Sequence, residues 1–248
     1  MKKSKIIIST ALRFAAFAVL ISALAVAASV AANGKDPLLS AFAGTDGGAG
    51  FTVVIDAGHG GVDGGAYGTV GEETVLEKDI NLEIAKRLYF LFRAAGIPCV
   101  MTRTEDIMLG EGKAYDLKNR LEITKSYENP VFISIHQNKF PEEHCRGLQV
   151  YYSKNAEESE TLALFIQNVC RRYTDPENER EIKRADSSIY LLDRLTCPAV
   201  LVECGFLSNA GECEKLTLPE YQKQLASAVF AAAAEFCGQS VGERDTQK

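Results

Sequence analysis

The sequence lacks several patterns that often assign a function directly. No two of its seven cysteines form a C-x-x-C pair, which disfavours zinc knuckles and dithiol redox motifs. A domain of this size needs no disulfide framework, so we expect mostly free thiols. No internal repeat is visible, and the 248 residues suit one domain of ordinary size with a short extension.

Excess positive charge is also missing from most of the chain. The net charge is −6, and it becomes −10 without the first 32 residues, which contain four basic residues and no acidic one. Such an acidic remainder gains nothing from the counterion release that drives nucleic-acid binding. We therefore expect no nucleic-acid partner.

The N-terminal segment is apolar and follows a basic start. Residues 14–32 form an Ala-rich run of 19 residues without a charge, close to the roughly 20 residues that span a bilayer. Small residues near its end suit signal cleavage. Residues 1–32 are therefore predicted to be a signal peptide or an N-terminal membrane anchor attached through residues 14–32, and the sequence does not distinguish the two. Either way, the rest of the chain is expected outside the cytoplasmic membrane.

Composition divides the remainder into three parts. Residues 33–50 are rich in Gly, Ala and Ser without a period, which is typical of a flexible linker. Residues 51–237 carry the regular hydrophobic patterns and are expected to form the folded domain. Residues 238–248 are polar and are predicted to be a frayed tail.

Strand and helix patterns alternate within residues 51–237. The predicted strands are 51–55, 98–102, 131–135, 147–152 and 199–202, with 189–192 as a further candidate, and the predicted helices are 78–95, 116–127, 156–173 and 220–236. This alternation indicates an α/β fold, a three-layer sandwich with a central, mostly parallel sheet flanked by helices.

Three predicted strands lead into a residue that can bind metal or move protons. These residues are His59, His136 and Glu203. The functional crevice of an open α/β sheet lies beyond the carboxyl ends of its strands, so we expect the three side chains to converge. The chain has only three histidines, and the third, His144, lies in a predicted loop and is expected on the surface. Glu203 has an alternative interpretation as half of a buried ion pair with Arg103 or Arg194.

Glycines surround His59. They are Gly58, Gly60, Gly61, Gly64 and Gly65. No Lys-Ser/Thr follows them as in a P-loop, so a nucleotide site is disfavoured. Their expected use is to let the backbone approach a metal or substrate closely.

A catalytic zinc site commonly uses two histidines and one carboxylate. Glu72, Glu73 and Glu77 all follow His59, and composition does not choose among them. Glu77 could instead close a capping box with Thr74 at the start of a helix.

Four motifs carry a family resemblance: DAGHGG at 56–61, LEKD at 76–79, SIHQN at 134–138 and VECGFLSN at 202–209. Together they resemble the zinc N-acetylmuramoyl-L-alanine amidases of the Amidase_3 type over residues 51–237. The resemblance implies that His59, Glu77 and His136 are zinc ligands and that Glu203 is the catalytic carboxylate. Ala57, Gln137 and Cys204 depart from the usual family residues, and none of them is an implied ligand.

The implied reaction is hydrolysis of the amide between N-acetylmuramic acid and the L-alanine of the stem peptide in peptidoglycan, using Zn²⁺. The chain resembles most the CwlD group of spore-forming bacteria, which implies a role in spore cortex maturation. Asp56 is a candidate for orienting a ligand histidine. The alternatives are a zinc peptidase of the stem peptide and a non-catalytic wall-binding protein, while a Cys204 nucleophile is disfavoured. Whether an activator protein is needed stays open.

Overall fold

The computed structural model describes residues 50–245, with side chains to residue 238. Its centre is a six-stranded sheet in the order β4-β1-β5-β8-β6-β7, in which only the β6–β8 pair is antiparallel. The strands are β1 (Thr52–Ala57), β4 (Cys99–Met101), β5 (Pro130–Asn138), β6 (Gln149–Tyr152), β7 (Lys183–Arg184) and β8 (Ala199–Phe206). The predicted mostly parallel sheet is confirmed.

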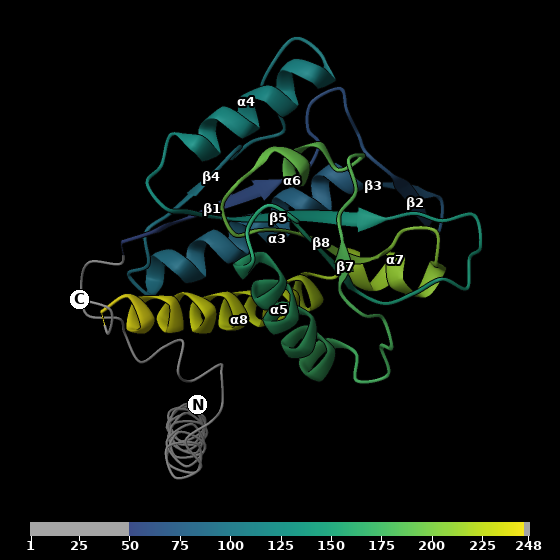
Figure 1. The fold of residues 1–248 in the computed structure, drawn as a ribbon. Coiled ribbons are helices and arrows are strands. Elements are labelled where there is room, and N and C mark those ends of the chain that lie inside the picture. The colour runs from purple at the N-terminus through teal and green to yellow at the C-terminus, as the bar shows by residue number, and fades with distance from the viewer. Residues whose placement is uncertain (1–49, 246–248) are drawn as a thin grey trace, which may run out of the picture.

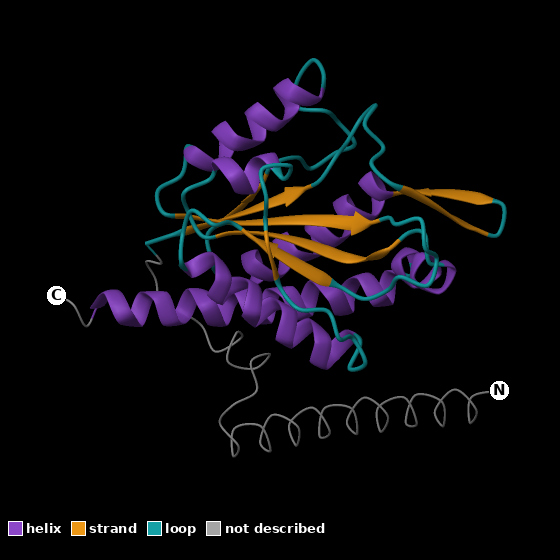
Figure 2. Cartoon of the chain, turned by 45° about the vertical axis from the view of Figure 1, so that its right-hand side comes forward, coloured by secondary structure: helices purple, strands orange, loops and turns teal. Residues whose placement is uncertain are grey.

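Helices cover both faces of this sheet, which confirms the predicted three layers (Figure 1). One face carries α3 (Glu77–Ala94), α5 (Glu158–Thr174) and α8 (Pro219–Asp245), and the other carries α4 (Lys113–Lys125) and the short α6 (Tyr190–Arg194). α7 (Ala210–Thr217) lies beside a separate two-stranded hairpin, β2 (Tyr67–Val70) and β3 (Glu73–Leu76). The hairpin projects from one side of the sheet (Figure 2).

The alternation of side chains along each strand creates two cores. In β1, Val53 and Ile55 belong to the large core beneath α3, α5 and α8, whereas Val54 belongs to the smaller core beneath α4 and α6. In β5, Ile133 and Phe132 divide in the same way. Successive strand residues point to opposite faces, so a continuous apolar run serves both cores at once.

The structure differs from the sequence prediction at several elements. The candidate strand at 189–192 is wrong, because these residues begin α6. β5 and β8 continue beyond 135 and 202, so His136 and Glu203 lie within strands. The β2–β3 hairpin, β7 and α7 were not predicted. α8 continues past residue 237 to Asp245, through most of the expected tail.

The predicted export segment at 1–32 and the linker up to residue 49 lie outside the described residues, as do residues 246–248. Within residues 50–245, every helix is too short or too polar to span a bilayer.

Candidate metal centre

The predicted site residues meet at the carboxyl edge of the three central strands. His59 lies in the turn two residues after β1, His136 lies in β5 and Glu203 lies in β8. His136 and Glu203 are directly paired in register, so their side chains share one face of the sheet. That face also carries Phe132 of the smaller core. The site therefore lies on the α4–α6 side of the sheet.

His59, Glu77 and His136 form a cluster of candidate metal ligands. One ligand atom of each lies within 4.8 Å of those of the other two. Nε2 of His59 is 3.2 Å from Oε2 of Glu77, and Nδ1 of His136 is 2.8 Å from Oε1 of the same carboxylate. Two imidazoles and one carboxylate are a standard donor set for catalytic zinc. The residues present fit a zinc ion.

The protein holds the Glu77 carboxylate in place from several sides. Oε2 accepts a hydrogen bond from the backbone N–H of Ala66, and Oε1 accepts hydrogen bonds from the backbone N–H of Gln137 and the side chain of Asn81. Burial alone would raise the pKa of Glu77, but hydrogen bonds from His136 and His59 outweigh it and hold the pKa well below its usual range. The side chain is therefore a fixed carboxylate, as a metal ligand must be.

The capping-box interpretation of Glu77 is wrong. The N-cap of α3 is Leu76, which makes no side-chain cap hydrogen bond, and Glu77 is the first residue of the helix. Its neighbours Glu72 and Glu73 are exposed. Of the three carboxylates that the sequence left open, only Glu77 reaches the histidines.

His59 is oriented by Asp63, which the sequence reasoning missed. Nδ1 of His59 lies 2.9 Å from Oδ2 of Asp63. Burial lowers the pKa of His59, but contacts with Glu77 and Asp63 outweigh it and raise the pKa overall. A second carboxylate on the far ring nitrogen fixes the tautomer and leaves Nε2 for a metal. The only sequence signal is an acidic residue four positions after the histidine in the same glycine-rich turn.

The expectation that Asp56 orients a histidine is wrong. Asp56 accepts hydrogen bonds from Arg120, Ser134 and Thr102. Burial would raise its pKa, but Arg120 and the two hydroxyl groups outweigh burial and lower it. Asp56 therefore serves as a buried counter-ion beneath the site.

Two glycines allow the close approach that the sequence predicted. A side chain at Gly58 would overlap the imidazole ring of His136. Gly65 has a φ of +69°, and a side chain there would meet Oε2 of Glu77 at 2.5 Å. Any larger residue at these positions would push His136 and Glu77 out of the candidate cluster.

One carboxylate oxygen of Glu203 is shielded from solvent. Its Oε2 is buried and makes no hydrogen bond within the described part of the chain. Burial raises the pKa of Glu203 to about 7. The ion-pair interpretation is wrong, since Arg103 donates to backbone carbonyls and Arg194 pairs with Asp193. A carboxylate with a pKa near neutrality is suited to proton transfer.

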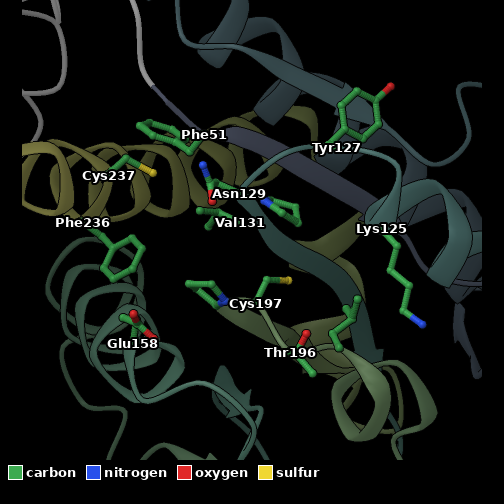
Figure 3. A pocket seen from close by; sticks show the side chains of 13 residues that line it. Phe51, Lys125, Tyr127, Asn129, Val131, Glu158, Thr196, Cys197, Phe236 and Cys237 are labelled. Carbon is green, nitrogen blue, oxygen red and sulfur yellow. The ribbon is translucent and has the colours of Figure 1, made fainter. Parts of the chain in front are cut away.

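A cavity of about 240 Å³ joins the candidate ligands to Glu203. His59, His136 and Glu203 line it together with α4 and α6 residues such as Lys113 and Tyr190. A larger cavity of about 560 Å³ lies at the opposite edge of the sheet, where the central strands begin (Figure 3). None of the candidate site residues lines that cavity. The smaller cavity is therefore the one associated with the chemistry.

His144 and Cys204, the two remaining residues considered from the sequence, are not part of the candidate metal site. His144 is exposed, as expected. Cys204 is a buried free thiol, and burial raises its pKa well above the usual range. Such a thiol stays protonated and is a poor nucleophile.

Comparisons with known proteins agree with this geometry. The family model of N-acetylmuramoyl-L-alanine amidases, Amidase_3, matches residues 53–235. The germination-specific N-acetylmuramoyl-L-alanine amidase of Bacillus subtilis (strain 168) is 38% identical over 189 residues, which cover 73% of this chain and 77% of that protein. The structure of the CwlD amidase from Clostridioides difficile, solved in complex with the GerS lipoprotein, is 37% identical with a TM-score of 0.69, covering 75% of this chain and 98% of that one. AmiC2 of Nostoc punctiforme is 32% identical with a TM-score of 0.66, covering 77% and 98%. The chain therefore belongs to the Amidase_3 family of N-acetylmuramoyl-L-alanine amidases, as its four motifs indicated.

Proposed function

We propose that this protein is a zinc-dependent amidase that releases the stem peptide of peptidoglycan by cleaving the bond between N-acetylmuramic acid and L-alanine. His59, Glu77 and His136 are the proposed zinc ligands, and Glu203 is the proposed catalytic carboxylate. The observation that carries the proposal is the buried Oε2 of Glu203, which has no hydrogen-bond partner among residues 50–238 and lies beside two imidazoles and a fixed carboxylate. A purely structural metal site would not need that fourth group.

A bound zinc ion supplies Lewis-acid chemistry, which activates an attacking water molecule and polarises the scissile carbonyl. The Oε2 atom of Glu203 accepts a proton from the attacking water. The same side chain then donates this proton to the nitrogen of the departing L-alanine. A pKa near 7 lets the same carboxyl act first as base and then as acid at neutral pH. Asp63 keeps the His59 ring in one orientation throughout.

The reaction is tested directly by its products. Full-length protein purified in mild detergent should contain zinc and should release an intact stem peptide from the sugar of a defined muropeptide. A zinc peptidase would instead cut within the peptide, and a wall-binding protein would bind zinc without turnover. Either result would replace the amidase proposal.

Glu77→Gln should weaken zinc binding, whereas Glu72→Gln and Glu73→Gln should leave it unchanged. A glutamine at 77 loses the negative charge and turns an amide N–H toward at least one of the donors that now surround the carboxylate. Titration with zinc in competition with a chromophoric chelator measures the affinity. Equal affinity in all three variants would remove Glu77 from the ligand set.

We place the catalytic domain outside the cytoplasmic membrane, where peptidoglycan lies. Protease added to intact, wall-stripped cells should therefore digest the chain beyond residue 32. Full protection would contradict export. The mass of the mature N-terminus then separates a cleaved signal peptide from a retained anchor.

Similarity to the germination-specific amidase supports a place in spore cortex maturation. The CwlD relative was solved with a lipoprotein partner, and we infer that an accessory protein of this kind can act with the present chain. Cortex peptidoglycan from a strain that lacks the protein should then yield muropeptides in which peptide-free muramic acid is missing.

A further inference from the structure

The turn that carries His59 is held by side chains from other elements. The backbone carbonyl of Ala57 accepts hydrogen bonds from Nε of Arg103 at 2.8 Å and from Nη1 of Arg120 at 2.7 Å. The carbonyl of Gly58 accepts one from Nη2 of Arg103 at 3.0 Å, and the carbonyl of His59 accepts one from Nη2 of Arg120 at 2.6 Å. Three consecutive carbonyls are thus bound by two guanidinium groups.

The conformation of this turn is one that the backbone does not favour by itself. His59 has a φ of +61°, in the left-handed region that residues other than glycine rarely adopt. Strained residues of this kind persist only where the surroundings fix them. Here the surroundings are the two arginines, whose side chains are 1–2% exposed.

Burial of Arg120 is possible because acidic residues neutralise its charge. Arg120 forms ion pairs with Asp56 and Asp116, both at 2.7 Å. These contacts hold the pKa of Arg120 above its usual range although burial lowers it. Unlike Arg120, Arg103 directs its donors only to backbone carbonyls. Arg120 is thus paired with two carboxylates and Arg103 with carbonyls only, but both side chains bind the same turn.

We propose that Arg103 and Arg120 are positioning residues of the metal centre, which hold the His59 turn in its strained conformation before the ion arrives. The proposal rests on the proposed function in that it takes His59 to be a zinc ligand. The ring of His59 is aimed at Glu77 by a backbone whose carbonyls are hydrogen-bonded to the guanidinium groups. Zinc then binds without first ordering the turn.

Arginine is required at both positions because of its shape. A guanidinium group offers five N–H donors in a rigid plane, whereas lysine offers one ammonium group on a flexible stem. Arg120 uses this plane to contact Asp56, Asp116 and two carbonyls together. A lysine keeps the charge but cannot span these partners.

The test compares Arg103→Lys and Arg120→Lys with Arg171→Lys in the full-length protein. Arg171 also donates to a backbone carbonyl and an acidic side chain, but it lies in α5 on the other face of the sheet. The zinc dissociation constant is measured by chelator competition, per folded molecule as judged by circular dichroism. Loss of a residue that supports a metal ligand typically weakens metal binding about 10- to 100-fold. We expect that weakening for Arg103→Lys and Arg120→Lys and none for Arg171→Lys.

Cobalt substitution gives a second readout. The visible spectrum of bound Co²⁺ reports ligand geometry and should broaden or shift in the two turn variants only. Unchanged zinc affinity and an unchanged cobalt spectrum in folded Arg103→Lys and Arg120→Lys would overturn the proposal. If Arg120→Lys does not fold, Arg103→Lys decides, and failure of both to fold would also overturn it by assigning the arginines to the fold as a whole. A wild-type protein that binds no zinc would instead contradict the proposed function.

Discussion

Replacement of Glu203 by glutamine is expected to lower amide hydrolysis at least 100-fold while zinc stays bound. The amide has nearly the volume of the carboxylate, and none of the proposed ligands is changed. What is lost is the proton acceptor, and general acid–base groups typically contribute about 10²–10⁴-fold to rate. Turnover of a defined muropeptide and zinc content, measured on the same sample, check both halves of this expectation.

Muropeptide binding and thermal stability provide the control for this variant. Both should remain near the wild-type values, because Oε2 of Glu203 has no partner to lose among the described residues. A folded, zinc-loaded Glu203→Gln protein with undiminished turnover would contradict the mechanism. Loss of zinc from this variant would instead point to Glu203 as a ligand.

His59→Ala and His136→Ala are each expected to abolish tight zinc binding, and with it the activity. Two remaining ligands do not hold a catalytic zinc ion well, since such sites normally use three protein ligands. Metal analysis of the purified variants after dialysis measures the effect. His144→Ala is the matched control, because His144 is the third histidine of the chain and is exposed.

The three variants together separate ligand loss from general damage. Stoichiometric zinc in His59→Ala or His136→Ala would remove that residue from the ligand set. Loss of zinc from His144→Ala would indicate a different site altogether.

Much of the fold follows from hydrophobic pattern. The strands of the central sheet other than β7 and the long helices show clear hydrophobic patterns, and the alternation of strand and helix predicts the layers. The run at 189–192 misled the prediction because four apolar residues fit a buried strand or a helix equally well. The hairpin formed by β2 and β3 escaped notice because its strands are short and largely exposed, although Gly71 with a φ of +61° marks its turn.

Most residues of the candidate site could be predicted from the sequence, but the side chains that orient them could not. His59, His136 and Glu203 could be found because strands lead directly to them, whereas Glu77 could be chosen over Glu72 and Glu73 only through the family resemblance. Asp56 and Asp63 are both close to His59 in sequence, and only the direction of the side chains distinguishes their roles. Asp56 lies in a strand and points toward Arg120 of α4, which is 64 residues away. No local pattern records such a contact.

The pairing of β5 with β8 determines which sequence changes between related enzymes can alter the site. The hydrogen-bond ladder from Phe132–Ala199 to His136–Glu203 sets the spacing between the His136 and Glu203 side chains. The segments that connect these strands do not set it. Insertions or deletions around residues 185–189, of which Ser188 and Ile189 line the cavity, would therefore reshape its wall and leave His136 and Glu203 at the same separation. A one-residue slip of the ladder would instead turn Glu203 to the opposite face. Substrate preference can thus diversify through the connecting segments while the arrangement of the reacting groups is inherited unchanged.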